Sequence, residues 1–259
     1  IVARDELARP GVDAVPLLER SHAAQAGIGF LSKAANLLHP RFGPWFFLGE
    51  LVLETELEPT PTPPTGSCGT CSACLDACPT GAIVAPGRVD AGRCISYHTI
   101  ENRGSIPREL RHAVGDWAFG CDVCSEVCPW GREAPDLAER FGTHSAVATA
   151  GLEQWLEFRE PAPWSEWLSG SPLQRAGRTG LARNAAIALA RRPSERSEVA
   201  LLQALSFDPS ALVREAAAWS LLAGNPDSSD LRDAVTRAAQ REPDAWARAE
   251  LLRSLDGEL

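Results

Sequence analysis

The chain contains eight cysteines, and their spacing is typical of iron–sulfur ligands. Seven of them form two runs, Cys68-x2-Cys71-x2-Cys74-x3-Cys78-Pro79 and Cys121-x2-Cys124-x3-Cys128-Pro129. The first run has the spacing with which bacterial ferredoxins bind one [4Fe–4S] cluster through three cysteines and reach a second cluster with the fourth. The second run is one cysteine short, and Cys94 completes two sets of four.

The last cysteine of each run is expected to cross to the other cluster, as in two-cluster ferredoxins. This predicts Cys68, Cys71, Cys74 and Cys128 for cluster 1, and Cys78, Cys94, Cys121 and Cys124 for cluster 2. Zinc is the main alternative, although it is usually bound by two CxxC pairs separated by a loop. Disulfides are disfavoured because eight cysteines in 259 residues are far fewer than a small disulfide-stapled protein has.

The composition favours a cytoplasmic protein with a local basic face. No apolar run approaches the roughly 18 residues of a membrane span, and no secretory or twin-arginine leader opens the chain. The net charge of −9 argues against general affinity for nucleic acids. Residues 171–196 nevertheless carry six arginines against one glutamate, a pattern that suits one specific polyanion.

Two residue types are absent or almost absent. There is no methionine, so Ile1 is not a translation start, and we expect the chain to be the C-terminal part of a longer protein. Among the 25 basic residues, Lys33 is the single lysine. A lysine kept in such a composition is a candidate for chemistry, with chance survival as the alternative.

The predicted elements of the first 66 residues place the candidate residues in turns. Pro16 begins a helix that ends near Gly27, which puts Asp13 in the preceding loop, either as a reactive carboxylate or as a local cap. A half-buried strand is predicted over residues 45–54, where alternate positions on one face carry Trp45, Phe47, Leu51 and Leu53. A stiff, proline-rich linker covers residues 58–66.

The rest of the chain is predicted to be largely helical. A short helix is expected over residues 107–114, between the cysteine runs. From about residue 170 the sequence is alanine-rich, and Leu-Ala-Arg183 recurs as Leu-Val-Arg214, 31 residues later, with a weaker echo at 246–248. This pattern predicts stacked helix pairs similar to HEAT repeats, with a plain helical bundle as the alternative.

Taken together, these features resemble the epoxyqueuosine reductases, cobalamin- and iron–sulfur-dependent enzymes of queuosine modification in tRNA. The resemblance runs from about Gly11 to the C-terminus and includes both cysteine runs and the helical tail. It also rests on Val12-Asp13-Ala-Val-Pro16-Leu-Leu-Glu-Arg20, Gly43-Pro-Trp45-Phe-Phe-Leu-Gly-Glu50, Cys94-Ile-Ser96-Tyr-His-Thr-Ile-Glu101, Gly120-Cys-Asp122-Val-Cys124 and Val127-Cys-Pro-Trp130. The family's cobalamin-binding domain begins upstream of these segments, in agreement with the missing methionine.

The resemblance implies an α+β protein in three parts: the C-terminal part of a cobalamin-binding domain (1–66), a ferredoxin-like two-cluster [4Fe–4S] domain (67–169) and HEAT-like α-helical repeats (170–259). It implies reduction of epoxyqueuosine to queuosine at the wobble position of tRNA, the last step of queuosine biosynthesis. Asp13 matches the family's proton donor beside cobalamin. Further cobalamin contacts are implied at Lys33, Ser96, Cys121 and Asp122, and tRNA contacts at Arg178, Arg183 and Asn184.

Two other functions share features with this sequence. Reductive dehalogenases use the same cofactors, but the helical tail and the lack of an export signal disfavour them. A noncatalytic ferredoxin-type electron-transfer subunit would bind clusters without cobalamin. For the reductase we expect a tRNA substrate, an external flavodoxin- or ferredoxin-like electron donor, no membrane contact and a monomer.

Overall fold

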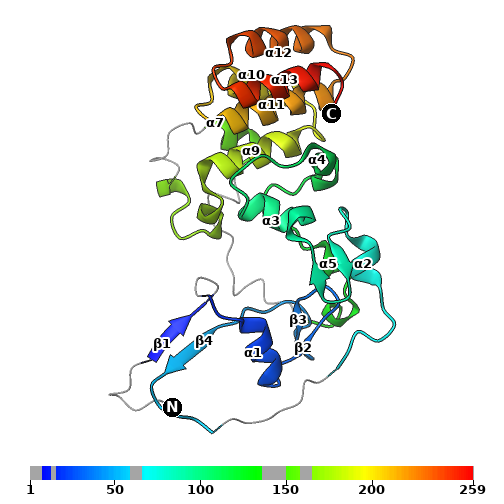
Figure 1. Cartoon of the computed structure of the whole chain (residues 1–259), viewed down its shortest axis with the longest axis vertical. Helices are drawn as coiled ribbons and strands as arrows, with labels where there is room; N and C mark the ends of the chain where they lie inside the picture. The colour runs from blue at the N-terminus through cyan, green and yellow to red at the C-terminus, as the bar shows by residue number, and fades with distance from the viewer. Residues whose placement is uncertain (1–7, 13–15, 59–65, 136–149, 158–164, 259) are drawn as a thin grey trace. The chain divides into compact units, whose positions relative to one another are not determined.

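The computed structural model describes residues 8–12, 16–58, 66–135, 150–157 and 165–258. By compactness the chain divides into two units, which are described separately (Figure 1). Unit 1 comprises residues 1–90 and 122–140, and unit 2 comprises residues 91–121 and 141–259. This division differs from the predicted boundaries at 66 and 169, because the segment between the cysteine runs packs with the helical tail.

In its described residues, unit 1 consists of two-stranded antiparallel sheets and short helices. The sheets pair β1 (Ala8–Gly11) with β4 (Glu50–Leu53), β2 (Phe30–Leu31) with β3 (Leu37–Leu38), and β5 (Ile83–Ala85) with β6 (Arg88–Val89). The helices are α1 (Glu19–Gln25), α2 (Ala73–Ala77) and α5 (Val123–Glu126). Two-stranded sheets are marginally stable alone, so these pairs mainly fix the turns between their strands.

The predictions for unit 1 are confirmed in part. A helix follows Pro16, but it begins at Glu19 and ends before Gly27, whose φ is 73°. The strand predicted over 45–54 is shorter, because only Glu50–Leu53 pairs, in register with the four residues of β1. Phe47 is 83% exposed, so the alternation does not mark a buried face. The predicted linker lies mostly outside the described residues.

Unit 2 is helical in its described residues. Its helices are α3 (Ile95–Ile100), α4 (Arg108–Val114), α7 (Leu152–Glu157), α9 (Gly177–Leu189), α10 (Glu195–Phe207), α11 (Ala211–Gly224), α12 (Ser229–Arg241) and α13 (Ala245–Leu255). The prediction for α4 is confirmed: the helix follows Pro107 and stops at Gly115, whose φ is 59°. Most residues of α9 and α11 are buried, and their many alanines allow neighbouring helices to pack closely.

The helices after residue 170 repeat every 34 residues. Helices α9, α11 and α13 begin at residues 177, 211 and 245, and α10 and α12 begin at residues 195 and 229. The repeat length of 31 residues suggested by Arg183 and Arg214 is therefore wrong. It is three residues, almost one helical turn, shorter than the observed period of 34. The helical tail itself is confirmed, and its assignment to HEAT repeats stays a prediction.

An arginine contact recurs with this 34-residue period. Asp208 and Glu242 lie three residues before α11 and α13 and are 2% and 4% exposed. The carboxylate of Asp208 accepts hydrogen bonds from Arg178 at 2.6 and 2.7 Å, and that of Glu242 accepts from Arg214 at 2.5 and 2.7 Å. Their carbonyl oxygens accept from Arg214 at 2.7 Å and from Arg248 at 2.9 Å, respectively. Each acid thus joins the helix one repeat earlier to the helix that follows it.

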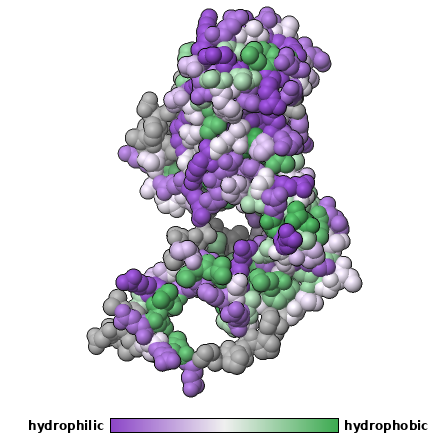
Figure 2. All heavy atoms as spheres, in the orientation of Figure 1, coloured by the Kyte–Doolittle hydropathy of each residue, from purple (hydrophilic) through white to green (hydrophobic). Residues whose placement is uncertain are grey.

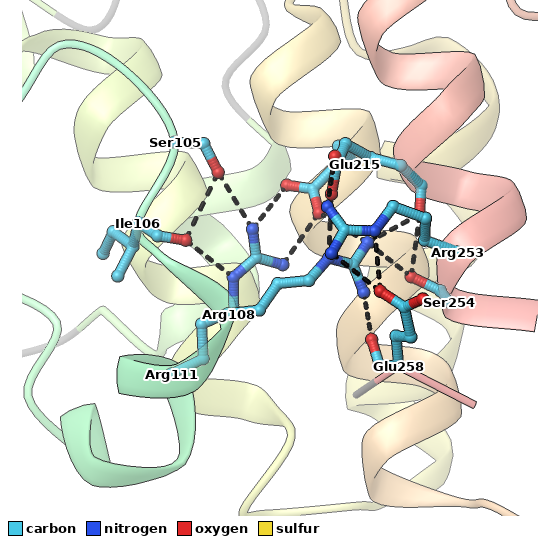
Figure 3. A network of polar contacts seen from close by, with 9 residues as sticks. Ser105, Ile106, Arg108, Arg111, Glu215, Arg253, Ser254 and Glu258 are labelled. Carbon is cyan, nitrogen blue, oxygen red and sulfur yellow. Dashed lines mark hydrogen bonds and ion pairs between the residues drawn. The ribbon is translucent and has the colours of Figure 1, made fainter. Parts of the chain in front are cut away.

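Helix α4 is fixed to the repeats by a buried ion pair (Figure 3). Arg111 donates to both carboxylate oxygens of Glu215 in α11 at 2.8 and 2.9 Å, and both side chains are 1% exposed. Arg108 donates to the same carboxylate and also to Glu250 and Ser254 of α13. The segment between the cysteine runs is therefore held by residues that lie 104 to 146 positions later.

The two units differ in surface character. Hydrophilic side chains predominate on the visible face of unit 2, whereas apolar side chains gather near β1 and β4 of unit 1 (Figure 2). Among them, Leu51 is 64% and Val52 53% exposed. None of the described helices is long and apolar enough to cross a membrane.

We predict that Glu215→Ala strongly destabilises unit 2. The substitution leaves the buried guanidinium of Arg111 without its carboxylate, and breaking such a pair costs about 3–5 kcal/mol. Denaturant unfolding followed by circular dichroism measures the loss, and the exposed carboxylate variant Asp233→Ala is the control. Replacement of both partners, Arg111→Met with Glu215→Leu, should recover most of the stability. A double variant as unstable as Glu215→Ala would contradict the charge argument.

Candidate metal centre

The first cysteine run forms a turn that leads into a short helix. Cys68 and Cys71 lie in the turn, where the backbone N–H of Cys71 donates to the carbonyl oxygen of Cys68 at 3.1 Å. Cys74 lies in α2, and Cys78 follows the last residue of that helix. All four thiols are partly exposed.

The second run packs against the first through α5. Cys124 lies in α5, which contacts α2, and Cys128 precedes a 3-10 turn over Pro129–Gly131. A cavity of about 120 Å³ lies between these segments. Its lining includes Cys68, Cys71, Cys74, Cys124 and Cys128. The structure thus brings together the four cysteines predicted for cluster 1, with one ligand predicted for cluster 2 beside them.

The cavity suits a cluster better than a single metal ion. Space of about 10–15 Å³ holds one water molecule, roughly a tenth of what this cavity offers. Within the described residues, no three side chains of His, Cys, Asp or Glu lie close enough to share one ion, as tetrahedral zinc with sulfur at about 2.3 Å would require. A [4Fe–4S] cluster has four separate irons, each bound by one thiolate, so its thiolates lie farther apart than those that share a single zinc ion. The four cysteines predicted for cluster 1 would supply one thiolate for each iron of such a cluster.

Burial and hydrogen bonds act in opposite directions on these thiols. Burial raises the pKa of Cys74. Burial also raises the pKa of Cys78, but hydrogen bonds from the backbone outweigh it and lower the pKa overall. The strongest of these comes from the N–H of Ala82, which lies 3.2 Å from Cys78 Sγ. N–H groups directed at sulfur stabilise its negative form and favour metal ligation.

Lys33 contacts the ligand loop of the first run. Its Nζ donates to the carbonyl oxygens of Gly69 and Cys71, each at 2.8 Å. Its backbone N–H lies 3.4 Å from the Sγ of Cys68. Two of the three N–H donors of the ammonium group therefore bind this loop. The contact of Lys33 with cobalamin stays a prediction.

The remaining predicted ligands and cobalamin contacts are divided between the two units. Unit 1 holds Cys78, Asp122 and Cys124, and unit 2 holds Cys94, Ser96 and Cys121. Cys94 directly precedes α3, and Ser96 lies in its first turn. Asp122 is exposed and directly precedes α5, and Asp13 lies outside the described residues. The second ligand set and the cobalamin contacts therefore stay predictions.

The expectation that Arg178 and Arg183 face tRNA is wrong for both side chains. Arg183 is 2% exposed, and its guanidinium donates to the carbonyl oxygens of His98 at 2.6 Å and Asn102 at 2.9 Å. Arg178 is 8% exposed and forms the two-bonded pair with Asp208 described above. Guanidinium groups held in this way brace the interior of unit 2.

Asn184, the third residue expected at the tRNA surface, is also buried. It has no exposed surface, and its Nδ2 donates to the carbonyl oxygens of Thr99 at 2.7 Å and Ala118 at 2.9 Å. The hydroxyl of Thr99 accepts the backbone N–H of Gly120 at 3.0 Å, next to Cys121. Asn184 therefore ties α3 to the backbone that carries Cys121, and its predicted role in RNA contact is corrected to this structural one.

Sequence reasoning assigned no role to Asn36 and Trp130, which line the cavity, or to Gly43, which lies against Trp130. A Cβ atom on Gly43 would lie 2.4 Å from the carbonyl oxygen of Trp130, so a glycine is required there, and its φ of 56° favours one as well. The Trp130 ring packs edge-on against Phe30 at 5.0 Å between centroids. Asn36 Nδ2 donates to Ser125 in α5 at 3.4 Å. Gly43 and Trp130 stand in the segments quoted for the resemblance, which was the available signal.

Comparisons with known proteins agree with this centre. Residues 67–131 match the family of 4Fe-4S double cluster binding domains. The epoxyqueuosine reductase of Xanthomonas campestris pv. campestris is 43% identical over 211 residues, or 81% of this chain and 59% of that protein. The epoxyqueuosine reductase of Pseudomonas aeruginosa is 44% identical over 217 residues, or 82% of this chain and 59% of that protein. The chain thus spans about three fifths of the length of these curated relatives.

Solved structures are similar over nearly the whole chain. A crystal structure of epoxyqueuosine reductase with an epoxyqueuosine-modified tRNA-Tyr stem loop matches at a TM-score of 0.87 and 30% identity, covering 97% of this chain and 66% of that one. The structure of the reductase from Bacillus subtilis with its catalytic loop swung out of the active site matches at 0.87 and 29% identity, with 98% and 66% covered. Sequence and structure thus agree on the same relatives.

We predict that Asn184→Asp destabilises unit 2. Aspartate keeps the shape and still accepts from Arg183, but it cannot donate to the two buried carbonyl oxygens. Each orphaned carbonyl costs roughly 1–3 kcal/mol. Urea unfolding measures the loss, with the exposed variant Gln203→Glu on α10 as the matched amide-to-acid control. A variant with the parent's stability but weaker tRNA binding would reinstate the surface role.

Proposed function

Because the chain is homologous to the epoxyqueuosine reductases over about four fifths of its length, we propose that it forms the cluster-binding and helical parts of an enzyme that reduces epoxyqueuosine in tRNA to queuosine. The observation that carries this proposal is the joint presence of the cysteine-lined cavity and the helical unit. A relative with both parts has been crystallised with a modified tRNA stem loop.

The proposed reaction removes an epoxide oxygen and leaves a carbon–carbon double bond. It consumes two electrons and two protons and releases water. The clusters supply single electrons, and cobalamin, when bound, supplies the strongly reducing centre. The departing oxygen needs a proton donor, and we assign this role to Asp13.

We assign the electron-transfer part to the eight cysteines as predicted. Cys68, Cys71, Cys74 and Cys128 hold cluster 1, supported by the cavity that they line. Cys78, Cys94, Cys121 and Cys124 hold cluster 2. A flavodoxin- or ferredoxin-like protein is the proposed external donor, and the working form is a monomer.

The basic segment 171–196 still supplies candidates for RNA contact after the correction above. Arg191 and Arg196 are exposed and flank the turn between α9 and α10. Phosphate contacts of this kind position RNA without reading its sequence, and they weaken as salt increases. We propose this turn, in place of the buried arginines, as part of the tRNA surface.

A reductive dehalogenase and a ferredoxin-type electron-transfer subunit remain the competing functions. A dehalogenase would share the clusters and cobalamin but would release halide from an organohalide. An electron-transfer subunit would bind clusters and no cobalamin. The helical unit favours the reductase, because its basic segment 171–196 could bind a polyanion such as tRNA, which neither alternative requires.

The decisive experiment is anaerobic turnover of tRNA that carries epoxyqueuosine by the complete protein with cobalamin and a low-potential reductant. We expect loss of one oxygen atom from the modified base, detected by mass spectrometry of tRNA nucleosides. Asp13→Asn should lower this rate roughly 10²–10⁴-fold while cobalamin and clusters remain bound. Halide release without tRNA turnover would identify a dehalogenase, and absence of both reactions would favour the electron-transfer subunit.

Cluster content gives a separate prediction. Reconstituted protein should contain about eight irons and eight sulfides, as two cubes require. Cys94→Ser should lose one cluster, and Cys74→Ser should lose the other, as distinguished by iron analysis and electron paramagnetic resonance of the reduced protein. Stoichiometric zinc without visible absorption would contradict the assignment.

A further inference from the structure

The lone lysine of the chain is built into the cysteine-lined cavity. Lys33 lies in the turn between β2 and β3, is half-buried and lines the same cavity as the cysteines. Its ammonium group binds the carbonyl oxygens of Gly69 and Cys71, each at 2.8 Å. Its backbone N–H lies 3.4 Å from the Sγ of Cys68. One residue thus makes three contacts with the loop that carries two of the four predicted ligands.

Lys33 makes this contact with a different head group from the arginines that form the buried ion pairs of the chain. An ammonium is a compact charge on a flexible stem, whereas a guanidinium is a planar fork that suits carboxylates. Where the chain binds buried carboxylates it uses arginine, as in the pairs of Arg111 with Glu215 and of Arg178 with Asp208. At Lys33 the acceptors are two carbonyl oxygens of one loop, and the compact ammonium group donates to both at 2.8 Å.

A cation in this position also acts on the electron affinity of a bound cluster. Four thiolates make the site negative, and each added electron makes it more so. Reduction potentials of iron–sulfur clusters depend on net charge and on hydrogen bonds to sulfur. A half-buried ammonium is screened less than one in bulk water, so it stabilises the reduced state and makes reduction easier.

We propose that Lys33 is a positioning residue that holds the ligand loop of cluster 1 and raises the reduction potential of that cluster. The inference rests on the proposed assignment of cluster 1 to Cys68, Cys71, Cys74 and Cys128. The step concerned is the gain of one electron by the cluster from the external donor.

Redox titration of the complete, cluster-loaded protein followed by electron paramagnetic resonance tests this role. Lys33→Gln removes the charge and retains amide donors, so the potential of cluster 1 should fall. We expect about a tenfold change in its reduction equilibrium, or about 59 mV for one electron. The potential of cluster 2 should stay at the parent value. Lys33→Arg keeps the charge and should keep the potential, but its larger head group should disturb the two loop contacts and speed the loss of iron in air.

Arg41→Gln provides the matched control, because it removes a cation from an exposed position of the same unit. The guanidinium of Arg41 lies over the Phe42 ring, and its backbone N–H donates to His39. Neither potential should change in that variant. Unchanged potentials in Lys33→Gln would overturn the proposal, as would weaker cobalamin binding at unchanged potentials, which would assign Lys33 to the corrin. Absence of clusters from the parent would instead refute the proposed function itself, so the two failures are distinguishable.

Discussion

Unit 2 depends on placing arginine cations in its interior without leaving their donors unpaired. A buried charge is costly unless it is hydrogen-bonded or paired. Burial, together with the positive charges of Arg111 and Arg103, lowers the pKa of Arg183 to about 10, so the group stays protonated at neutral pH. Backbone carbonyls of the segment between the cysteine runs supply its acceptors. That segment therefore folds around the guanidinium of Arg183 in α9. Arg111 of the same segment forms a buried ion pair with Glu215 of α11.

Unit 1 has a different source of order. One small buried apolar cluster in its described residues consists of Ala23, Ala24 and Leu37, with Phe46 and Leu48 packed against it. Small cores of this size usually need metal sites or other cross-links, and ligation is then coupled to folding. A cluster held by residues 68–74 and by Cys128 would join segments more than fifty positions apart. The two units thus use ligation and buried charge for the same purpose.

Local patterns were readable from the sequence, and long-range partners were not. The spacing of the cysteines identified the residues of the cavity, and Pro107 with Gly115 marked both ends of α4, because these signals act over a few residues. Arg183 was expected at an RNA surface from the family resemblance, and neither that resemblance nor the basic segment around it reveals which side chains are buried. The repeat length was misjudged for a related reason: Arg183 and Arg214 occupy similar sequence contexts, but their acceptors come from different parts of the chain.

The ties between α4 and the last helices have a consequence for synthesis of the chain. Arg108 and Arg111 emerge from the ribosome with their own segment, but their acceptors lie 104 to 146 positions later. At about 5–20 residues per second, these acceptors follow roughly 5–30 s afterwards. During that interval the two guanidinium groups lack their carboxylate partners in α11 and α13, and the segment with Cys94 and Cys121 is not yet held by them. The cavity lined by Cys68, Cys71, Cys74 and Cys128 has all its thiols as soon as Cys128 emerges. A cluster held by these four thiols could therefore form in unit 1 before α13, which binds Arg108, has been synthesised.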